Sequence, residues 1–160
     1  MKPVGPTIIL FAQKEYPFAK GGVPSARLML AAEPAELMEA VKQDRVAIII
    51  LDTAHPKFND QLVMRMYRRT PNSEFWLVAE DDDHTLPEYV VDAVLPHGLD
   101  RREFEKKVAA CLRIKGLMEE CHLVGKSVQL KRTAEMIAQV APTDISTLII
   151  GPSGSGKELV

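Results

Sequence analysis

Short apolar runs, many of them rich in β-branched residues, recur along this chain, with helical patterns between several of them. Each run predicts a short buried strand, and the runs span residues 7–11, 27–31, 46–51, 75–79, 90–95 and 147–150. Apolar residues at helical spacing predict helices at 34–42 and 59–69. Strands that alternate with helices favour a parallel sheet covered on both faces. The predicted fold class is therefore α/β.

Two of the crossovers in this pattern are short. About a dozen residues, among them Pro17, Gly21, Gly22 and Pro24, separate the first two predicted strands, which is too few for a full helix and its loops. The segment between the fourth and fifth predicted strands is equally short. We therefore expect a reduced or missing helix at both places.

The longest predicted helix begins after Asp100, which can cap it, and runs from 101 to about 121. Either only its first half packs on the sheet, or its far end also pairs with a second copy to give a homodimer or higher oligomer. After Gly125 the composition changes, and Ser127 can cap another helix that runs to about 139. A domain boundary is therefore predicted near residue 122, between domains 1–121 and 122–160.

Composition excludes some classes of function. Twenty basic residues against 22 acidic residues give a net charge of -2, so no overall field attracts this segment to nucleic acid or to an anionic membrane. No apolar run approaches the roughly 20 residues of a membrane span, and no signal region follows the first residues, so a cytoplasmic protein is expected. The histidines and cysteines show no metal-ligand spacing, and no metal site is predicted.

A glycine-rich turn near the end of the chain carries the clearest chemical pattern. Gly151, Gly154, Gly156 and Lys157 follow the apolar run 148–150, so a predicted strand leads into the turn. Backbone N–H groups of such a turn cradle phosphates, and the lysine ammonium reaches the terminal phosphates. The pattern predicts a site for a nucleoside triphosphate, the alternative being a flexible loop without a ligand.

Three ordered blocks extend this pattern, namely Leu123-Val124-Gly125-Lys126-Ser127, Val140-Ala141-Pro142-Thr143-Asp144 and the segment from Leu148 to Val160. Together they resemble the start of the AAA+ domain of bacterial sigma-54-dependent transcriptional activators. Glu158 is informative, because generic phosphate loops carry Ser or Thr after the lysine to hold Mg²⁺. The sequence departs from the family at Pro152 and Ser155, where Glu and Thr are common, and both changes leave the backbone cradle intact.

The resemblance implies ATP as the cofactor, together with Mg²⁺ in the full-length family. Nucleotide contacts are implied for Gly151, Pro152, Ser153, Gly154, Ser155, Gly156, Lys157 and Glu158, with Val124 and Gly125 near the adenine. Hydrolysis in such proteins remodels the sigma-54 RNA polymerase complex in a ring of subunits. The hydrolysis motifs, the polymerase-contacting loop and any DNA-binding helix-turn-helix are expected after residue 160. No catalytic residue is therefore assigned in this chain, and whether it is an enzyme stays open.

Residues 7–115 are similar in outline to a response-regulator receiver of two-component systems, which implies a flavodoxin-like sheet. Asp52 and Pro56 follow the run 46–51 and resemble the phosphoacceptor segment Asp-x-x-x-Pro. The run from Leu95 to Asp100, followed by a helix, resembles the last strand and helix of a receiver. This implies a regulatory domain ahead of the ATPase.

The rest of the phosphotransfer machinery is missing. Ala12 and Gln13 stand where receivers carry the acidic pair that holds Mg²⁺, Ala79 stands at the hydroxyl position and His97 at the lysine position. One aspartate alone cannot stabilise the charge on a transferring phosphoryl group. Phosphorylation of Asp52 by the standard route is therefore not expected.

The leading hypothesis is the regulatory N-terminal part of a sigma-54-dependent transcriptional regulator, with a degenerate receiver-like domain and a P-loop at its end. A non-enzymatic regulatory and dimerisation module is one alternative, and a fragment of an unrelated P-loop ATPase or kinase is another. The acidic run 80–83 is expected to remain solvated rather than to bind a cation.

Overall fold

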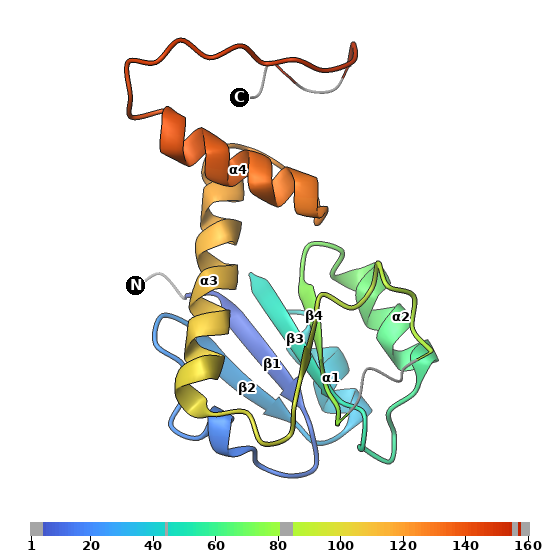
Figure 1. Ribbon diagram of the computed structural model, residues 1–160. Coiled ribbons are helices and arrows are strands. Elements are labelled where there is room, and N and C mark those ends of the chain that lie inside the picture. The colour runs from blue at the N-terminus through green and yellow to red at the C-terminus, as the bar shows by residue number, and fades with distance from the viewer. Residues whose placement is uncertain (1–4, 44, 81–84, 155–156, 158–160) are drawn as a thin grey trace. The chain divides into compact units, whose positions relative to one another are not determined.

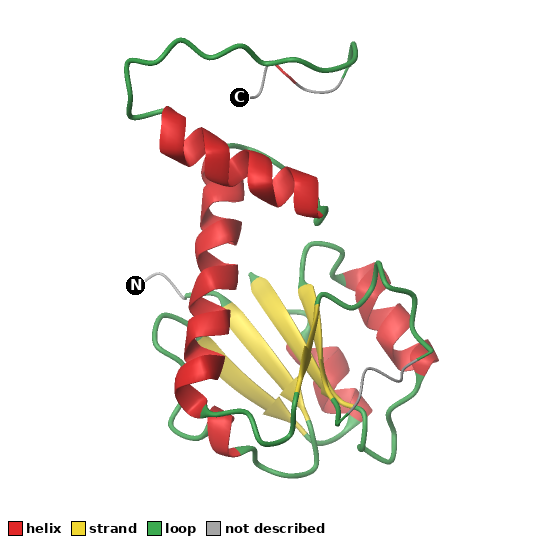
Figure 2. Cartoon of the chain, viewed as in Figure 1, coloured by secondary structure: helices red, strands yellow, loops and turns green. Residues whose placement is uncertain are grey.

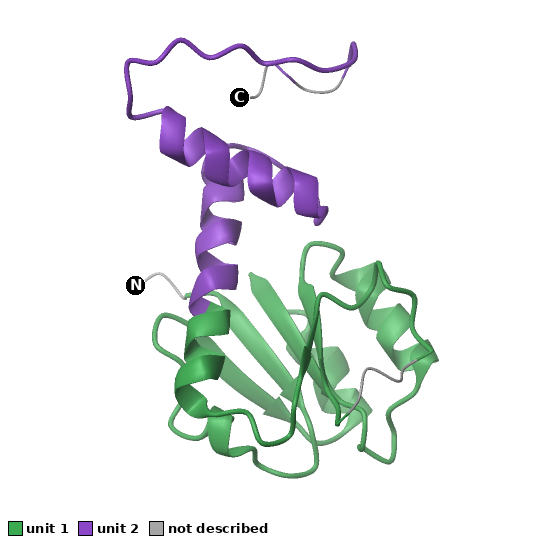
Figure 3. Cartoon of the chain, in the orientation of Figure 1, with its two compact units in different colours: residues 1–108 green, residues 109–160 purple. Residues whose placement is uncertain are grey.

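The computed structural model describes residues 5–43, 45–80, 85–154 and 157. The chain divides into two compact units, residues 1–108 and 109–160 (Figure 3). The division falls inside the longest helix. The boundary near residue 122 rests on composition and stays a prediction.

The first unit is built on a five-stranded sheet in which all neighbouring strands are parallel. Its strands are β1 (Thr7–Phe11), β2 (Arg27–Ala31), β3 (Val46–Asp52), β4 (Glu74–Val78) and β5 (Ala93–Leu95). They lie in the order β2-β1-β3-β4-β5 (Figure 1). β1 and β4 are buried along their whole length, as strands covered on both faces are. After the first residue of each strand, Thr7 and Glu74, their sequences are apolar without alternation. The predicted α/β class with a flavodoxin-like strand order is confirmed.

Helices cover both faces of this sheet (Figure 2). On one face, α1 (Pro34–Ala40) and α2 (Asp60–Arg69) join a core of strand residues. This core includes Ile9, Phe11, Leu37, Ile49, Leu51, Leu62, Val63, Met66, Phe75 and Leu77. On the other face lies the first half of α3 (Arg101–Glu120), where Phe104 is fully buried and its ring centroid is 4.7 Å from that of Phe18. The predicted packing of this half-helix on the sheet is confirmed.

Side-chain caps define where two helices begin. Asp100 Oδ2 accepts a hydrogen bond from the Arg102 N–H at 2.9 Å, at the start of α3. Ser127 Oγ accepts from the Leu130 N–H at 3.2 Å, at the start of α4 (Val128–Val140). Each oxygen satisfies one of the N–H groups that a helix start leaves without an internal partner. Both predicted caps are confirmed.

The short crossovers contain little helix, as predicted. Only η1, a 3-10 helix at Pro17–Ala19, separates β1 from β2. In the described residues between β4 and β5, 79–80 and 85–92, there is no helix. The bounds of β5 differ from prediction, because Val90 lies in a turn in which its N–H donates to the Pro87 carbonyl. β4 begins one residue earlier than predicted, and α1 ends at Ala40 instead of residue 42.

The strand predicted at 147–150 is wrong. Residues 144–150 form no strand, and the side chains of Leu148 and Ile150 are 81% and 85% exposed. An apolar segment becomes a strand only where neighbouring strands satisfy its backbone and cover its side chains. Among the described residues of the second unit, no other strand is present to pair with this segment. The helices of that unit are linked by an ion pair between Arg113 of α3 and Glu135 of α4, at 2.8 Å.

Candidate functional site

The carboxyl ends of β1 and β3 mark the place where the chain's path across the sheet reverses direction. β1 leads to β2 on one side, and β3 leads to β4 on the other. In open parallel sheets, ligands bind outside the carboxyl ends of the strands at such a point. Asp52, the last residue of β3, lies here with its side chain only 4% exposed. Its Oδ1 accepts a hydrogen bond from the Ala54 N–H at 2.9 Å.

His97 lies between two carboxylates at this edge. Its Nδ1 is 2.6 Å from Glu80 Oε1, and its Nε2 is 3.7 Å from Asp52 Oδ1. Asp52 ends β3, Glu80 comes two residues after β4, and His97 comes two residues after β5. The imidazole thus connects the ends of three neighbouring strands.

Tyr16 covers this cluster from the segment that follows β1. Its side chain is fully buried, and its ring stacks on the His97 ring with centroids 5.8 Å apart. Its hydroxyl has no hydrogen bond of good geometry within the described part of the chain. Burial, then interaction with the Asp52 carboxylate and the charge of Glu80, raise the pKa of the Tyr16 phenol above its ordinary value of 10.0. The phenol is therefore neutral at physiological pH.

The residues that the structure describes around Asp52 do not fit a magnesium ion. Ala12 and Gln13 follow β1 and bring no carboxylate, and Ala79 brings no hydroxyl. The nearest hydroxyl on β3's own loop, that of Thr53, donates to the Val78 carbonyl at 3.0 Å. Among residues 5–43, 45–80, 85–154 and 157, no group of three or more His, Cys, Asp or Glu side chains could hold a metal. A hard cation such as Mg²⁺ needs several oxygen ligands.

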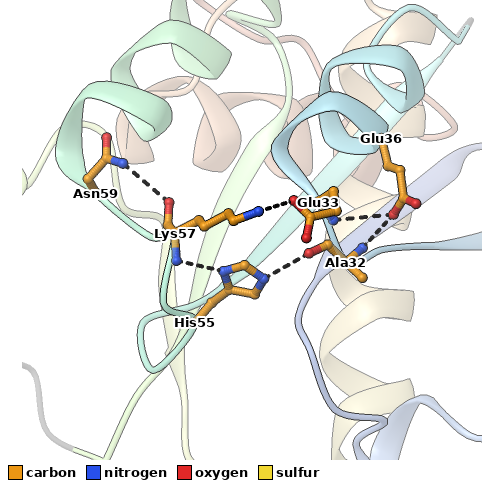
Figure 4. Close-up of polar contacts among 6 residues, drawn as sticks. All are labelled: Ala32, Glu33, Glu36, His55, Lys57 and Asn59. Atoms are coloured by element: carbon orange, nitrogen blue, oxygen red, sulfur yellow. Dashed lines mark hydrogen bonds and ion pairs between the residues drawn. The ribbon is translucent and has the colours of Figure 1, made fainter.

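His55 forms a second buried contact at the same edge (Figure 4). Its Nδ1 accepts a hydrogen bond from the Lys57 N–H, and its Nε2 donates to the Ala32 carbonyl, both at 3.0 Å. Its ring lies on Phe11, with centroids 4.1 Å apart. An ion pair between Lys57 and Glu33 spans the same two loops. His55 therefore ties the loop after β3 to the loop after β2.

Sequence reasoning identified Asp52 and His97 but missed Tyr16, Glu80 and His55. Glu80 was expected to be solvated, and its side chain is indeed 77% exposed, yet one carboxylate oxygen bonds His97. The sequence did contain a signal for Glu80, because it comes just after the predicted strand 75–79 and the carboxyl ends of parallel strands lie at the same edge of a sheet. Residues 81–83 of the acidic run lie outside the described residues.

Residues 151–154 of the predicted phosphate loop are exposed, and Lys157 is partly buried. Lys157 Nζ donates to the Gly151 carbonyl at 3.0 Å and to the Pro152 carbonyl at 2.5 Å, so the lysine folds back over the loop. Gly154 has a φ of 75°, a conformation that glycine adopts without strain. Val124 and Gly125 lie in the link before α4. Ser153 belongs to the exposed turn, and Ser155, Gly156 and Glu158 lie outside the described residues.

Residues 123–160 match the family model of the sigma-54 interaction domain. This segment is the start of a sigma-54 interaction domain. The chain thus combines a receiver-like fold with a segment that matches the sigma-54 interaction domain. Within the described residues, no helix has the length and apolar character needed to cross a membrane.

Solved structures resemble the receiver-like part of this chain. The signal receiver domain of an HD domain-containing protein from Pseudomonas fluorescens Pf-5 aligns with a TM-score of 0.60 and 16% identity, over 75% of this chain and 96% of that one. NtrX from Brucella abortus, solved in complex with ADP, aligns with a TM-score of 0.57 and 14% identity, over 87% of this chain and 35% of NtrX. A redox sensor of the streptococci, from a family described as evolved from two-component response regulators, aligns with a TM-score of 0.57 and 16% identity. The alignment covers 78% of this chain and 58% of that one. At these identities the likeness establishes the fold.

Proposed function

We propose that this chain is the regulatory N-terminal part of a sigma-54-dependent transcriptional regulator that binds ATP at residues 151–157 and does not use Asp52 as a standard phosphoacceptor. The observation that carries the proposal is the sigma-54 interaction match at 123–160 on a chain whose first unit has a receiver fold. The partner implied is the sigma-54 RNA polymerase complex, which the assembled ATPase ring remodels. Contact with DNA belongs to other parts of the protein.

The chemistry around Asp52 supports the second half of the proposal. Phosphoryl transfer depends on charges that neutralise the phosphoryl oxygens in the transition state. Asp52 is instead buried beside His97 and under Tyr16, and the loop after β1 offers no acidic pair. The receiver fold therefore keeps its architecture while its phosphotransfer groups are replaced.

The loop residues support nucleotide binding. Gly154 already has the backbone conformation that a glycine turn requires, and the Lys157 ammonium lies at 3.0 Å from the Gly151 carbonyl, within reach of a phosphate held by the loop. Residues Gly151 to Lys157 would hold the phosphates of ATP, whose Mg²⁺ would neutralise their charge. Val124 and Gly125 would lie near the adenine.

Replacing Lys157 by alanine is expected to weaken ATP binding about 10- to 100-fold, because a charged hydrogen bond to phosphate is lost. The protein should carry the remainder of the sigma-54 interaction domain after Val160, and titration calorimetry gives the affinity. Lys106→Ala, which removes an exposed lysine of α3, is the matched control and should bind as the wild type does. Equal affinity of Lys157→Ala and wild type, or no ATP binding by either, would contradict the proposal.

A further inference from the structure

β2 forms one edge of the sheet, and the outer side of this strand is open (Figure 1). The Arg27 N–H donates to the carbonyl of Pro6, which leads into β1, so Arg27 and every second residue after it bond toward β1. The backbone N–H and C=O groups of Leu28 and Leu30 therefore point away from the sheet. The described residues offer these outward groups no hydrogen-bond partner.

The side chains of the same two leucines are incompletely covered. Met29 and Ala31 join the core under α1 and α2, so Leu28 and Leu30 project to the opposite face of the sheet, where α3 lies. Leu30 is 59% exposed, and Leu28 is half-buried. This exposure follows from the short crossover, because only η1 stands where a full helix between β1 and β2 would cover this face.

β2 also lacks the features that usually protect an edge strand. Such strands are commonly very short, interrupted by proline or a bulge, or charged along their length. β5, at the opposite edge, has only three residues. β2 has five residues, no proline and a regular register with β1, and its one charged residue is the first, Arg27. A strand of this kind is a template for pairing with a strand of another molecule.

We propose that β2 pairs with β2 of a second copy of this chain, antiparallel and centred on Met29. In this register Leu28 of each copy lies opposite Leu30 of the other, and the two residues exchange the hydrogen bonds that are open in the single chain. Residues directly opposite each other project to the same face, so the two leucines of each copy cover those of the other. Met29 meets its own equivalent at the two-fold axis, as a contact between identical surfaces requires.

The charges at the two ends of β2 favour this partner and this orientation. Arg27 is exposed at the start of the strand, and Glu33 and Glu36 follow its end, at the start of α1. Glu33 pairs with Lys57, whereas Glu36 uses one carboxylate oxygen for two backbone N–H groups. Antiparallel pairing directs each Arg27 toward the acidic end of the other copy's strand, and parallel pairing would bring like charges together. A second copy therefore supplies the complementary charges as well as the complementary leucines.

Sedimentation velocity of the whole chain tests for this dimer, and wild type is expected to dimerise as its concentration rises. Leu30→Lys replaces the apolar contact by a charge on both sides of the two-fold axis and should weaken dimerisation about 30-fold or more. Because Leu30 is mostly exposed, the variant should fold, which circular dichroism checks. Val128→Lys is the matched control, since Val128 is 60% exposed but lies in α4, and it should dimerise as wild type does. A monomeric wild type, or a dimer that Leu30→Lys leaves intact, overturns the proposal.

Cysteine cross-linking tests the register itself, in a chain whose Cys111 and Cys121 are replaced by serine. In the proposed pair the two Met29 Cα atoms lie roughly 4.5 Å apart, which a disulfide can bridge. The two Leu30 Cα atoms are offset along the strands and lie more than about 7 Å apart, beyond that reach. After oxidation, Met29→Cys is expected to run as a covalent dimer on a non-reducing gel, and Leu30→Cys as a monomer, although Leu30 is the more exposed. Equal linkage of the two variants, or none of Met29→Cys, overturns the proposal.

Discussion

Replacement of Phe104 by alanine is expected to lower the free energy of unfolding of the receiver-like domain by about 3–5 kcal/mol. Phe104 is fully buried at the start of α3, and its ring contacts Phe18 at 4.7 Å and Trp76 at 6.5 Å between centroids. Alanine loses this apolar burial and leaves a cavity between helix and sheet. Urea unfolding followed by circular dichroism measures the change, because Trp76 fluorescence would itself respond to loss of the neighbouring ring.

Two control variants separate packing from other effects. Phe104→Leu keeps most of the volume and should cost less than Phe104→Ala, because the cavity it leaves is smaller. Arg102→Ala changes an exposed residue of the same helix turn and should remain within about 0.5 kcal/mol of wild type. A loss below about 1 kcal/mol for Phe104→Ala would mean that α3 is not part of the domain core.

His55→Ala is expected to cost about 2–4 kcal/mol, because each buried partner left without a hydrogen bond costs roughly 1–3 kcal/mol. The variant removes the acceptor of the Lys57 N–H and the donor to the Ala32 carbonyl, together with the contact on Phe11. Thermal or urea unfolding of the variant gives the change. Amide hydrogen exchange should also accelerate in the loops after β2 and β3.

Lys57→Ala is the matched control for His55→Ala. It removes only the ion pair to Glu33, whose two side chains are about half exposed, while its backbone N–H still donates to His55. A surface ion pair contributes at most about 1 kcal/mol. Equal losses in the two variants would show that the ion pair, and not the buried imidazole, holds the loops together.

Much of the fold could be predicted because burial on both sides leaves strands without polar alternation. β1 and β3 stand out as apolar runs, and the missing helices follow from the short segments between strands. The errors have one physical origin. The start of the predicted strand 90–95, at Val90, and the segment 147–150 are apolar like the true strands. A strand, however, also needs a neighbouring strand to pair with. Val90 is buried within a turn, and 147–150 has no described neighbouring strand.

The candidate site could be predicted only in part. Asp52 comes directly after one predicted strand and His97 two residues after another, so the parallel topology alone brings them to one edge. Tyr16 and His55 lie in loops, whose conformations depend on turns that no periodic pattern specifies. A buried tyrosine in place of metal ligands could therefore be recognised only in three dimensions.

The groups that carry out phosphotransfer in a receiver are replaced in this chain. The question of how the domain is regulated therefore concerns the carboxyl edge of the sheet, where those groups would lie. Asp52, Glu80 and His97 form a contact within the protein where a receiver would exchange a phosphoryl group.

The most direct measurement is intact-protein mass spectrometry after incubation with acetyl phosphate and Mg²⁺, and in parallel with beryllofluoride. An active receiver domain under the same conditions confirms that the reagents work, and Asp52→Asn gives the background. The expected result is that wild type and Asp52→Asn give the same spectrum, with no stoichiometric adduct. A stoichiometric adduct on wild type that is absent from Asp52→Asn would contradict the account.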